Sequence, residues 1–307
     1  MRALVTGGAG FIGSHLVHRL VTEGHSVSVV DDLSTGHREN LAGCDVALTA
    51  LDLSRDPIDN LVKGVDTIFH LAAVPSVPRS VREPLRSHEA AATATLRLLD
   101  AARGASVGTF VNSSSSSVYG NVAQPPMVET MPTLPRSPYA VAKLAAEGYT
   151  RVFADLHGMR TVSLRYFNVF GPRQDPSSAY AAAIPRFVAA YISRESPKVY
   201  DDGKQSRDFT YVANVVEANI LAATAARLTG ESVNVAAGEP RSVLDLLHAI
   251  ADVFGYWLEP EFLPARPGDI RDSHADISLA QTLLKYKPIA SFTEGLSQTI
   301  GWLRGQD

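Results

Sequence analysis

The stretch that decides the fold reads ALVTGGAGFIG and spans residues 3–13. Its first part, Ala3–Thr6, is short and apolar and stops at glycines, which predicts a buried strand. From Phe11 onward the apolar residues recur at helical spacing, and Gly24 ends this pattern. The next apolar run, Ser26–Val30, predicts a second buried strand. The chain therefore opens with a strand, a tight turn, a helix and another strand.

The turn between the first strand and the helix carries three regularly spaced glycines, Gly7, Gly10 and Gly13. Such glycines allow a tight turn, close approach of the backbone to a pyrophosphate, and close packing of the helix on the strand. The helix N-terminus offers free N–H groups and a partial positive charge to the phosphates. A glycine-rich turn that binds nothing is the alternative, but the flanking strand and helix favour dinucleotide binding.

Asp31 follows the second predicted strand, close to the spacing of about 20 residues expected for a carboxylate that binds ribose hydroxyls. A carboxylate at this place repels a 2′-phosphate, and Asp32 adds to the repulsion, so NAD is favoured over NADP. The alternative is a solvated carboxylate at a strand end. Asp52 and Leu53 end the next predicted strand, where we expect them to meet the adenine.

The alternation of strands and helices continues along the chain, which predicts right-handed crossovers and a parallel sheet covered on both faces. Further strands are expected at Val46–Ala50, Thr67–Leu71, Thr109–Ser113, Thr161–Arg165 and Val233–Val235, and helices at Pro57–Lys63, Pro84–Arg103, Tyr139–His157 and Val212–Ala226, with a polar loop at Gly171–Tyr180. The fold class is therefore α/β, a Rossmann-like doubly wound parallel sheet with a smaller, interleaved C-terminal α/β substrate domain. We assign residues 1–165 and about 207–236 to an NAD-binding domain, and about 166–206 and 237–307 to the substrate domain.

Composition narrows the functional classes. The 307 residues are 45% hydrophobic and carry a net charge of −4 without a basic block, so nucleic acid is an unexpected partner. No apolar run is long enough to cross a membrane, and glycines interrupt the apolar N-terminus, which we interpret as structure rather than a signal peptide. Cys44 is the one cysteine, which excludes an internal disulfide and a cysteine-based zinc cluster. We expect a cytoplasmic protein without a metal site.

Tyr139 and Lys143 stand four residues apart on one predicted helix, so their side chains share a face. A lysine ammonium beside a phenol favours the phenolate and lowers the pKa of the tyrosine towards working pH. An ordinary surface pair is the alternative. The serines from Ser113 to Ser117, likewise, could be a plain polar loop. The position of the tyrosine and lysine after this serine-rich strand end, in a nucleotide-binding fold, favours catalysis.

Six ordered motifs carry a resemblance to a known family. They are HLAA (70–73), NSSSSSVYG (112–120), SPYAVAK (137–143), RYFNVFGPRQ (165–174), RDFTYV (207–212) and RPGD (266–269). Together with the spacing of the glycines, they resemble the extended short-chain dehydrogenases/reductases, and within them the NAD-dependent UDP-hexose 4-epimerases. The resemblance runs from Arg2 to about Leu303 and implies NAD as cofactor, a UDP-sugar as substrate and a homodimer formed through the helices at Pro84–Arg103 and Tyr139–His157.

The resemblance also implies site residues. The catalytic residues are Ser115, Tyr139 and Lys143. The cofactor-binding residues are Gly7, Gly10, Phe11, Ile12, Gly13, Asp31, Asp32, Asp52, Leu53, Leu71, Ala72, Ala73, Tyr139, Lys143 and Tyr166. The substrate-binding residues are Ser76, Ser115, Ser116, Tyr139, Asn168, Gln174, Val199, Tyr200, Arg207, Arg266, Asp269 and Ser273. Relatives usually carry an asparagine at a position that aligns with Ala90 or Ala91, so the cofactor geometry there departs from the pattern.

The implied reaction is a reversible oxidation at C4 of the sugar, through a transient 4-keto sugar. Related dehydratases and UDP-glucuronate decarboxylases resemble this segment but carry a glutamate where this chain has Ser117, which argues for epimerisation. A nucleotide-sugar lyase, a UDP-glucuronate 4-epimerase and a non-catalytic NAD sensor remain the alternatives.

The sugar is the least determined feature. Ser273 lies four positions after Asp269. A chain with a bulky tyrosine at this position would resemble enzymes limited to UDP-glucose and UDP-galactose. A small residue there resembles enzymes that also accept UDP-GlcNAc and UDP-GalNAc, and Gln174 and the segment SVPRS (76–80) agree. Asp175 stands where glucuronate epimerases tend to carry an arginine, which disfavours UDP-glucuronate. A plain loop serine at 273 is the alternative.

Overall fold

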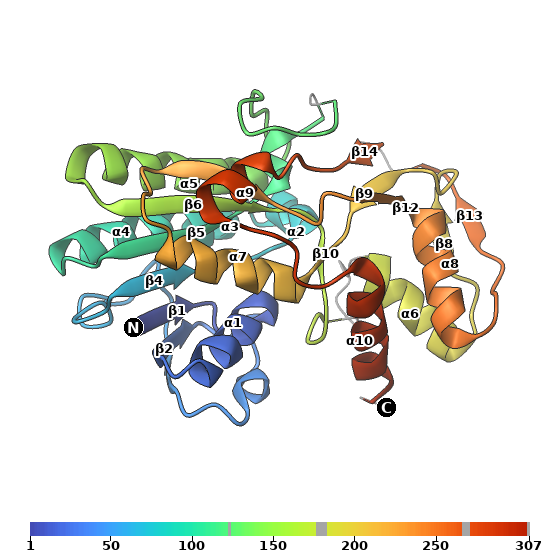
Figure 1. The fold of residues 1–307 in the computed structure, drawn as a ribbon, viewed down its shortest axis with the longest axis horizontal. Helices are drawn as coiled ribbons and strands as arrows, with labels where there is room; N and C mark the ends of the chain where they lie inside the picture. The colour runs from blue at the N-terminus through green and yellow to red at the C-terminus, as the bar shows by residue number, and fades with distance from the viewer. Residues whose placement is uncertain (122–123, 176–182, 266–270, 306–307) are drawn as a thin grey trace.

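A parallel sheet of seven strands forms the centre of the protein, as a computed structural model describes it for residues 1–121, 124–175, 183–265 and 271–305 (Figure 1). Its order is β11-β6-β5-β4-β1-β2-β3, and every pairing in it is parallel. The strands are β1 (Arg2–Thr6), β2 (Ser26–Asp31), β3 (Ala47–Ala50), β4 (Thr67–His70), β5 (Thr109–Ser115), β6 (Arg160–Tyr166) and β11 (Glu231–Val235). This is the predicted Rossmann-like fold class.

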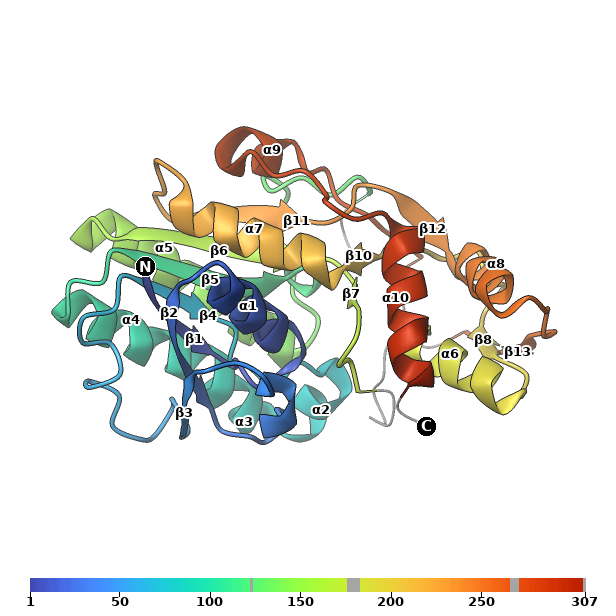
Figure 2. The same ribbon diagram turned by 60° about the horizontal axis from the view of Figure 1, so that its bottom comes forward.

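Helices cover both faces of the sheet (Figure 2). On one face α1 (Phe11–Thr22) packs against α7 (Val212–Thr224), and α9 (Ser278–Leu284) extends this layer onto α7 and β11. On the other face α4 (Ala94–Gly104) packs against α5 (Pro138–His157). Because both faces of the sheet are covered, its strands are largely buried, with apolar segments such as ALV in β1 and IF in β4.

The strand order reverses between β1 and β4, since the chain leaves β1 for β2 on one side and returns to β4 on the other. Ligands of open α/β sheets bind outside the carboxyl ends of the strands at such a reversal. The glycine turn after β1 and the segment after β4 meet there, which positions the candidate site.

A second hydrophobic core lies beyond this end of the sheet. It is built from α6 (Ala183–Ser193), α8 (Val243–Phe254), α10 (Phe292–Arg304) and the paired strands β8 (Lys198–Tyr200) and β13 (Glu261–Leu263). Short strands connect it to the sheet: β7 (Val169–Phe170) pairs with β10 (Thr210–Tyr211), and β9 (Ser206–Asp208) lies between β12 (Pro240–Ser242) and β14 (Asp272–Ser273). The chain passes repeatedly between the two cores, because α7, β11 and α9 return to the first one.

The predicted helix at Pro57–Lys63 is wrong, because this segment forms turns. Its apolar residues Ile58 and Val62 are buried, which mimics helical spacing in the sequence. The Arg97 guanidinium donates hydrogen bonds to the carbonyls of Leu53 and Asp56, at 2.7 and 2.8 Å. These contacts fix the start of the segment as a loop against α4.

The predicted helix at Pro84–Arg103 forms in three parts. A helix α3 (Pro84–His88) continues through a π-helical turn, Glu89–Thr93, into α4. Ala91, one of the two positions where an asparagine was expected from the resemblance, is buried in this turn and packs with Ala142 of α5. Small side chains on both helices therefore allow close packing next to Lys143.

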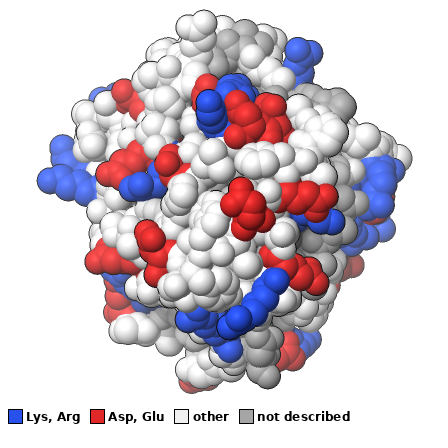
Figure 3. All heavy atoms as spheres, turned by 90° about the vertical axis from the view of Figure 1, so that its right-hand side faces the viewer, with Lys and Arg blue, Asp and Glu red and all other residues white. Residues whose placement is uncertain are grey.

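Acidic and basic side chains are interspersed on the face of the molecule that carries the second core (Figure 3). In the described part of the chain, no helix combines the length and the apolar character needed to cross a membrane.

Candidate active site

The glycine turn after β1 is shaped so that side chains are excluded from it. Gly7 has φ +68°, and a Cβ there would lie 2.7 Å from the Ala72 nitrogen. A Cβ on Gly13 would lie 2.1 Å from the Gly7 carbonyl oxygen. The turn thus packs closely on the segment Leu71–Ala73, and Gly10 begins α1 without a side-chain cap. This cradle, with uncapped helix N–H groups, fits the pyrophosphate of a dinucleotide.

Asp31 ends β2 and is 6% exposed. Its carboxylate accepts hydrogen bonds from the backbone N–H groups of Ala9 and Leu33, at 3.0 and 2.9 Å. Burial raises the pKa of Asp31, although these hydrogen bonds oppose the rise. The carboxylate therefore stands directly beside the glycine turn, whereas Asp32 is exposed and binds the backbone of Ser34.

We expect Asp31→Asn to raise the affinity for NADP relative to NAD by roughly tenfold, because the charge that would face a 2′-phosphate is removed while the shape is kept. Fluorescence titration of the protein with both dinucleotides measures this ratio. Asp32→Asn is the matched control and should change the ratio less. Equal affinity of the unaltered protein for both dinucleotides would contradict this assignment of Asp31.

The other predicted cofactor residues lie at the same end of the sheet, and each has its own contacts within the protein. Leu53 is buried in the core, and the Asp52 carboxylate accepts hydrogen bonds from the backbone and hydroxyl of Ser54. Phe11 and Ile12 begin α1. The Tyr166 hydroxyl is hydrogen-bonded to Asn219.

The end of β5 meets the start of α5, and this junction brings the three predicted catalytic residues together. The Ser137 side chain caps α5 by accepting from the Ala140 N–H, with Pro138 in the first turn. Tyr139 therefore lies in the first turn and lines the same cavity wall as Ser115, which favours the ionised form of the tyrosine hydroxyl. Lys143 follows one turn later and is 4% exposed.

The pKa of Tyr139 corrects one expectation. Burial raises this pKa, and Ser115 opposes the rise. The expected lowering by Lys143 is absent because the Lys143 ammonium is directed elsewhere, donating to the carbonyl and hydroxyl oxygens of Ser113 at 2.7 and 3.2 Å. Burial also lowers the pKa of Lys143 to about 8, while Glu147 acts in the opposite direction.

A cavity of about 780 Å³ opens in front of this junction. The predicted residues that line it are Ile12, Ser115, Ser116, Tyr139, Tyr166, Asn168, Arg207 and Ser273, and Val77, Ser117, Asn121 and Arg136 also line it. No carboxylate is found among the described residues of its wall. Since a phenol and a serine hydroxyl share this wall, the cavity can exchange a proton with a bound hydroxyl group.

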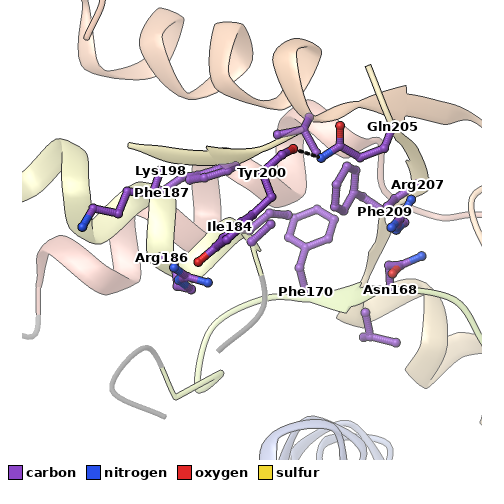
Figure 4. A pocket seen from close by; sticks show the side chains of 13 residues that line it. Asn168, Phe170, Ile184, Arg186, Phe187, Lys198, Tyr200, Gln205, Arg207 and Phe209 are labelled. Carbon is purple, nitrogen blue, oxygen red and sulfur yellow. Dashed lines mark hydrogen bonds between the residues drawn. The ribbon is translucent and has the colours of Figure 1, made fainter. Parts of the chain in front are cut away.

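A second cavity, of about 280 Å³, lies between the short strands and the second core (Figure 4). Asn168 and Arg207 line both cavities, so the two share a border. Figure 4 shows Arg186 and Lys198 on one side of the smaller cavity and Arg207 on the other. An anionic ligand with an aromatic end suits this arrangement, because guanidinium groups match phosphate oxygens and Tyr200 and Phe187 offer ring faces.

The remaining predicted substrate residues lie outside these walls. Ser76 caps the short helix α2 (Val77–Arg82), and Gln174 donates a hydrogen bond to the Val169 carbonyl oxygen at 3.1 Å. Val199 is fully buried, because alternation along β8 directs its neighbours Lys198 and Tyr200 to the cavity instead. Arg266, Asp269 and the second half of the predicted polar loop, residues 176–180, lie outside the described residues.

Sequence reasoning missed Arg186, Lys198 and Gln205 in the smaller cavity. The alternation of Lys198 with Tyr200 on a short strand was a usable signal for Lys198. Gln205 is 9% exposed; its amide nitrogen donates to the Tyr200 carbonyl oxygen at 2.8 Å, and its amide oxygen has no partner among the described residues. No local pattern marks Arg186, which reaches the cavity only through the packing of α6.

The glycine cradle and the tyrosine–serine junction on one Rossmann-like sheet define a dinucleotide-dependent enzyme class. The model of the NAD-dependent epimerase/dehydratase family matches residues 3–236, and the chain belongs to this family, whose cofactor is NAD as predicted. It is 39% identical to a UDP-glucose 4-epimerase of Mycolicibacterium smegmatis, over 100% of this chain and 99% of the relative.

Two solved structures are similar over the whole chain. One is a UDP-N-acetylglucosamine 4-epimerase from Methanobrevibacter ruminantium in complex with UDP-N-acetylmuramic acid, with a TM-score of 0.96, 41% identity and coverage of 100% of this chain and 99% of that one. The other is the UDP-glucose 4-epimerase of Thermus thermophilus in complex with NAD, with a TM-score of 0.91, 35% identity and coverage of 100% of both chains.

Proposed function

We propose that this enzyme interconverts the C4 epimers of a UDP-hexose through a transient 4-keto sugar. The observation that carries the proposal is the position of Tyr139, which lies with Ser115 on the wall of the larger cavity. Asn168 and Arg207 join this cavity to the smaller one, so a single ligand with a sugar at one end and a nucleotide at the other suits the pair. The named relatives support the same reaction.

In this mechanism Tyr139 takes the proton from O4 of the sugar, and Ser115 relays it by hydrogen bonding to both oxygens. When bound, NAD would supply a reversible acceptor for the C4 hydride. Lys143 would hold the nicotinamide ribose, and in that position its charge would favour the ionised form of Tyr139, which it does not do while it binds Ser113. The keto sugar turns about its diphosphate, which Arg207 and Asn168 anchor, and presents its other face. Tyr139 then returns the proton to O4, so no net oxidation takes place.

The wall of the larger cavity supports epimerisation over elimination. Ser117 lines it where related dehydratases and decarboxylases carry a glutamate, and its hydroxyl has no hydrogen-bond partner among the described residues. Without a carboxylate at this place, the extra acid–base group for removing water or carbon dioxide is missing. The retained tyrosine and lysine argue against a non-catalytic NAD sensor.

The substrates we propose are UDP-glucose and UDP-galactose together with UDP-GlcNAc and UDP-GalNAc. Ser273 lines the larger cavity and is 6% exposed, which leaves room beside the sugar. Arg207 pairs with Ser273 in the neighbouring strand and lines the same cavity, where its guanidinium would bind the diphosphate.

The decisive experiment incubates the purified protein with each UDP-sugar, without added NAD, and analyses the products by NMR and mass spectrometry. We expect an epimer of unchanged mass. A product that has lost water or carbon dioxide would establish a lyase, and conversion of UDP-glucuronate alone would establish the glucuronate epimerase.

We further propose that the protein forms a homodimer. Exposed apolar side chains gather on the packed helices α2, α3 and α5, with Val81 64%, Leu85 78% and Leu156 72% exposed. Light scattering should give about twice the chain mass of 32.9 kDa, and a mass of one chain would refute the dimer.

We also propose that NAD binds to residues 1–165 and 207–236, and that the nucleotide sugar binds to residues 166–206 and 237–307. The helix α9 is excepted from the second group, because it packs on the sheet.

A further inference from the structure

A buried carboxylate, Glu147, lies on α5 one turn beyond Lys143 and two turns beyond Tyr139. It is 5% exposed, and it is absent from the described walls of both cavities. It therefore touches neither of the spaces in which substrate would bind. A buried charge is costly unless its environment is arranged for it, so its partners matter.

The partners of Glu147 come from three strands. Ser114 of β5 donates a hydrogen bond to its Oε1 at 2.5 Å. Arg165 of β6 forms a two-pronged ion pair, with Nε to Oε1 at 2.9 Å and Nη2 to Oε2 at 2.7 Å. Ser232 of β11 donates to Oε2 at 2.9 Å. One carboxylate thus fastens α5 across three neighbouring strands of the sheet.

These contacts grip the end of β5 at successive residues. Lys143 binds Ser113 and Glu147 binds Ser114, and the next residue, Ser115, shares the cavity wall with Tyr139 and lowers its pKa. The distance between the serine and tyrosine hydroxyls therefore depends on how α5 is fastened to this strand. A small displacement of a reacting group lowers a rate strongly.

The charges around this site leave Glu147 as the group that favours the ammonium form of Lys143. His70 of β4 is buried, and burial together with the charge of Lys143 lowers its pKa to about 3, so it adds no positive charge beside Lys143. Arg165 is engaged by Glu147 and by the Tyr119 hydroxyl, which accepts from its Nη1 at 2.8 Å. Glu129 interacts with Arg165 and Tyr119 from the far side. Burial lowers the pKa of Lys143, and Glu147 is the group that opposes it.

We propose that Glu147 is a positioning residue for the epimerisation, which keeps Lys143 charged and holds the Ser115 hydroxyl against Tyr139 without touching substrate. This inference rests on the proposed function. The competing explanation is that the Glu147–Arg165 pair only stabilises the fold.

The test compares a double variant that removes the charges of Glu147 and Arg165 with a single variant that removes only one hydrogen bond to Glu147. Glu147→Gln alone leaves Arg165 buried without its partner, so the double variant E147Q/R165M removes both charges and should recover the melting temperature. Ser232→Ala is the matched control, since it removes one hydrogen bond to Glu147 and keeps both charges. Glu147→Asp keeps the charge but shortens the reach to Ser114.

We expect E147Q/R165M to lower kcat about 100-fold and to change KM for the UDP-sugar less than about threefold. The basic limb of the pH profile should move about one unit lower, because Lys143 loses its proton at lower pH without Glu147. Ser232→Ala should keep the kcat and pH profile of the unaltered enzyme. Glu147→Asp should lower kcat without moving the basic limb. A double variant with recovered stability and an unaltered kcat and pH profile would overturn the inference, as would an unaltered kcat of Glu147→Asp.

A titration that needs no sugar separates this inference from the proposed function. The ultraviolet absorbance of the Tyr139 phenolate is measured against pH in the NAD-bound protein, with Tyr139→Phe in each background as the blank. The double variant should ionise Tyr139 about one pH unit higher, because Lys143 has lost its counter-charge. An unchanged titration would refute the role of Glu147, whereas absence of epimerase activity in the unaltered protein would refute the proposed function.

Discussion

Tyr139→Phe is expected to fold and to bind NAD but to lower kcat for epimerisation by about 10³-fold, because it removes the group that exchanges a proton with O4. The substitution deletes one oxygen of a side chain that lines the larger cavity beside Ser115. Packing is therefore hardly changed. NMR of UDP-galactose formed from UDP-glucose measures the rate, and a melting curve with NAD checks the fold.

Tyr149→Phe provides the matched control, since Tyr149 lies on the same helix, is 37% exposed and lines neither cavity among the described residues. Its activity should equal that of the unaltered enzyme. Turnover of Tyr139→Phe close to that of the control would remove Tyr139 from the mechanism.

Ser273→Tyr is expected to abolish conversion of UDP-GlcNAc, by about 100-fold or more, and to leave conversion of UDP-glucose within a few-fold. Ser273 is buried at the wall of the larger cavity and lies opposite Arg207 in the pairing of β14 with β9. A tyrosine at this position would extend into the cavity, because Ser273 lines its wall. The added ring would fill the space that an acetamido group needs.

Ser273→Ala is the control for this effect, since it removes the hydroxyl without adding bulk and should preserve both activities. Both variants are compared by NMR with the two UDP-sugars and by melting temperature, because overpacking can destabilise a core. Unaltered enzyme that converts UDP-galactose rapidly but leaves UDP-GlcNAc unchanged would refute the assignment of this pocket.

Much of the fold could be predicted because its central strands carry their own signal. Strands such as β1 and β4 are buried, and short apolar segments such as ALV and IF mark them. The segment 57–63 could not be predicted, because buried residues at helical spacing arise equally from turns that pack on a helix. The π-helical turn at Glu89–Thr93 left no local signal either, since its alanines favour an ordinary helix.

The candidate site also contains residues that the sequence predicts and residues that it does not. Tyr139, Lys143 and Ser115 lie in short ordered motifs, so the sequence alone points to them. Glu147 meets Arg165 through packing of a helix on a strand, and neither residue belongs to a local pattern that predicts the pair. Contacts of this kind depend on the register of whole elements, which a single sequence does not specify.

The repeated passage of the chain between its two cores has a consequence for unfolding. Since α7 and β11, and later α9, belong to the first core and segments of the second core precede and follow each of these two parts, no single cut yields two self-sufficient fragments. The loss of one core removes the anchoring of the other. Denaturation by urea should therefore be all-or-none.

The tryptophans make this cooperativity measurable. Trp302 packs against the second core, and Trp257 stacks on His248 of α8, so tryptophan fluorescence reports that part of the chain. Circular dichroism, in contrast, is dominated by the larger sheet and its covering helices. Coincident urea midpoints from the two signals would establish that the molecule melts as one unit, despite its two separate interiors.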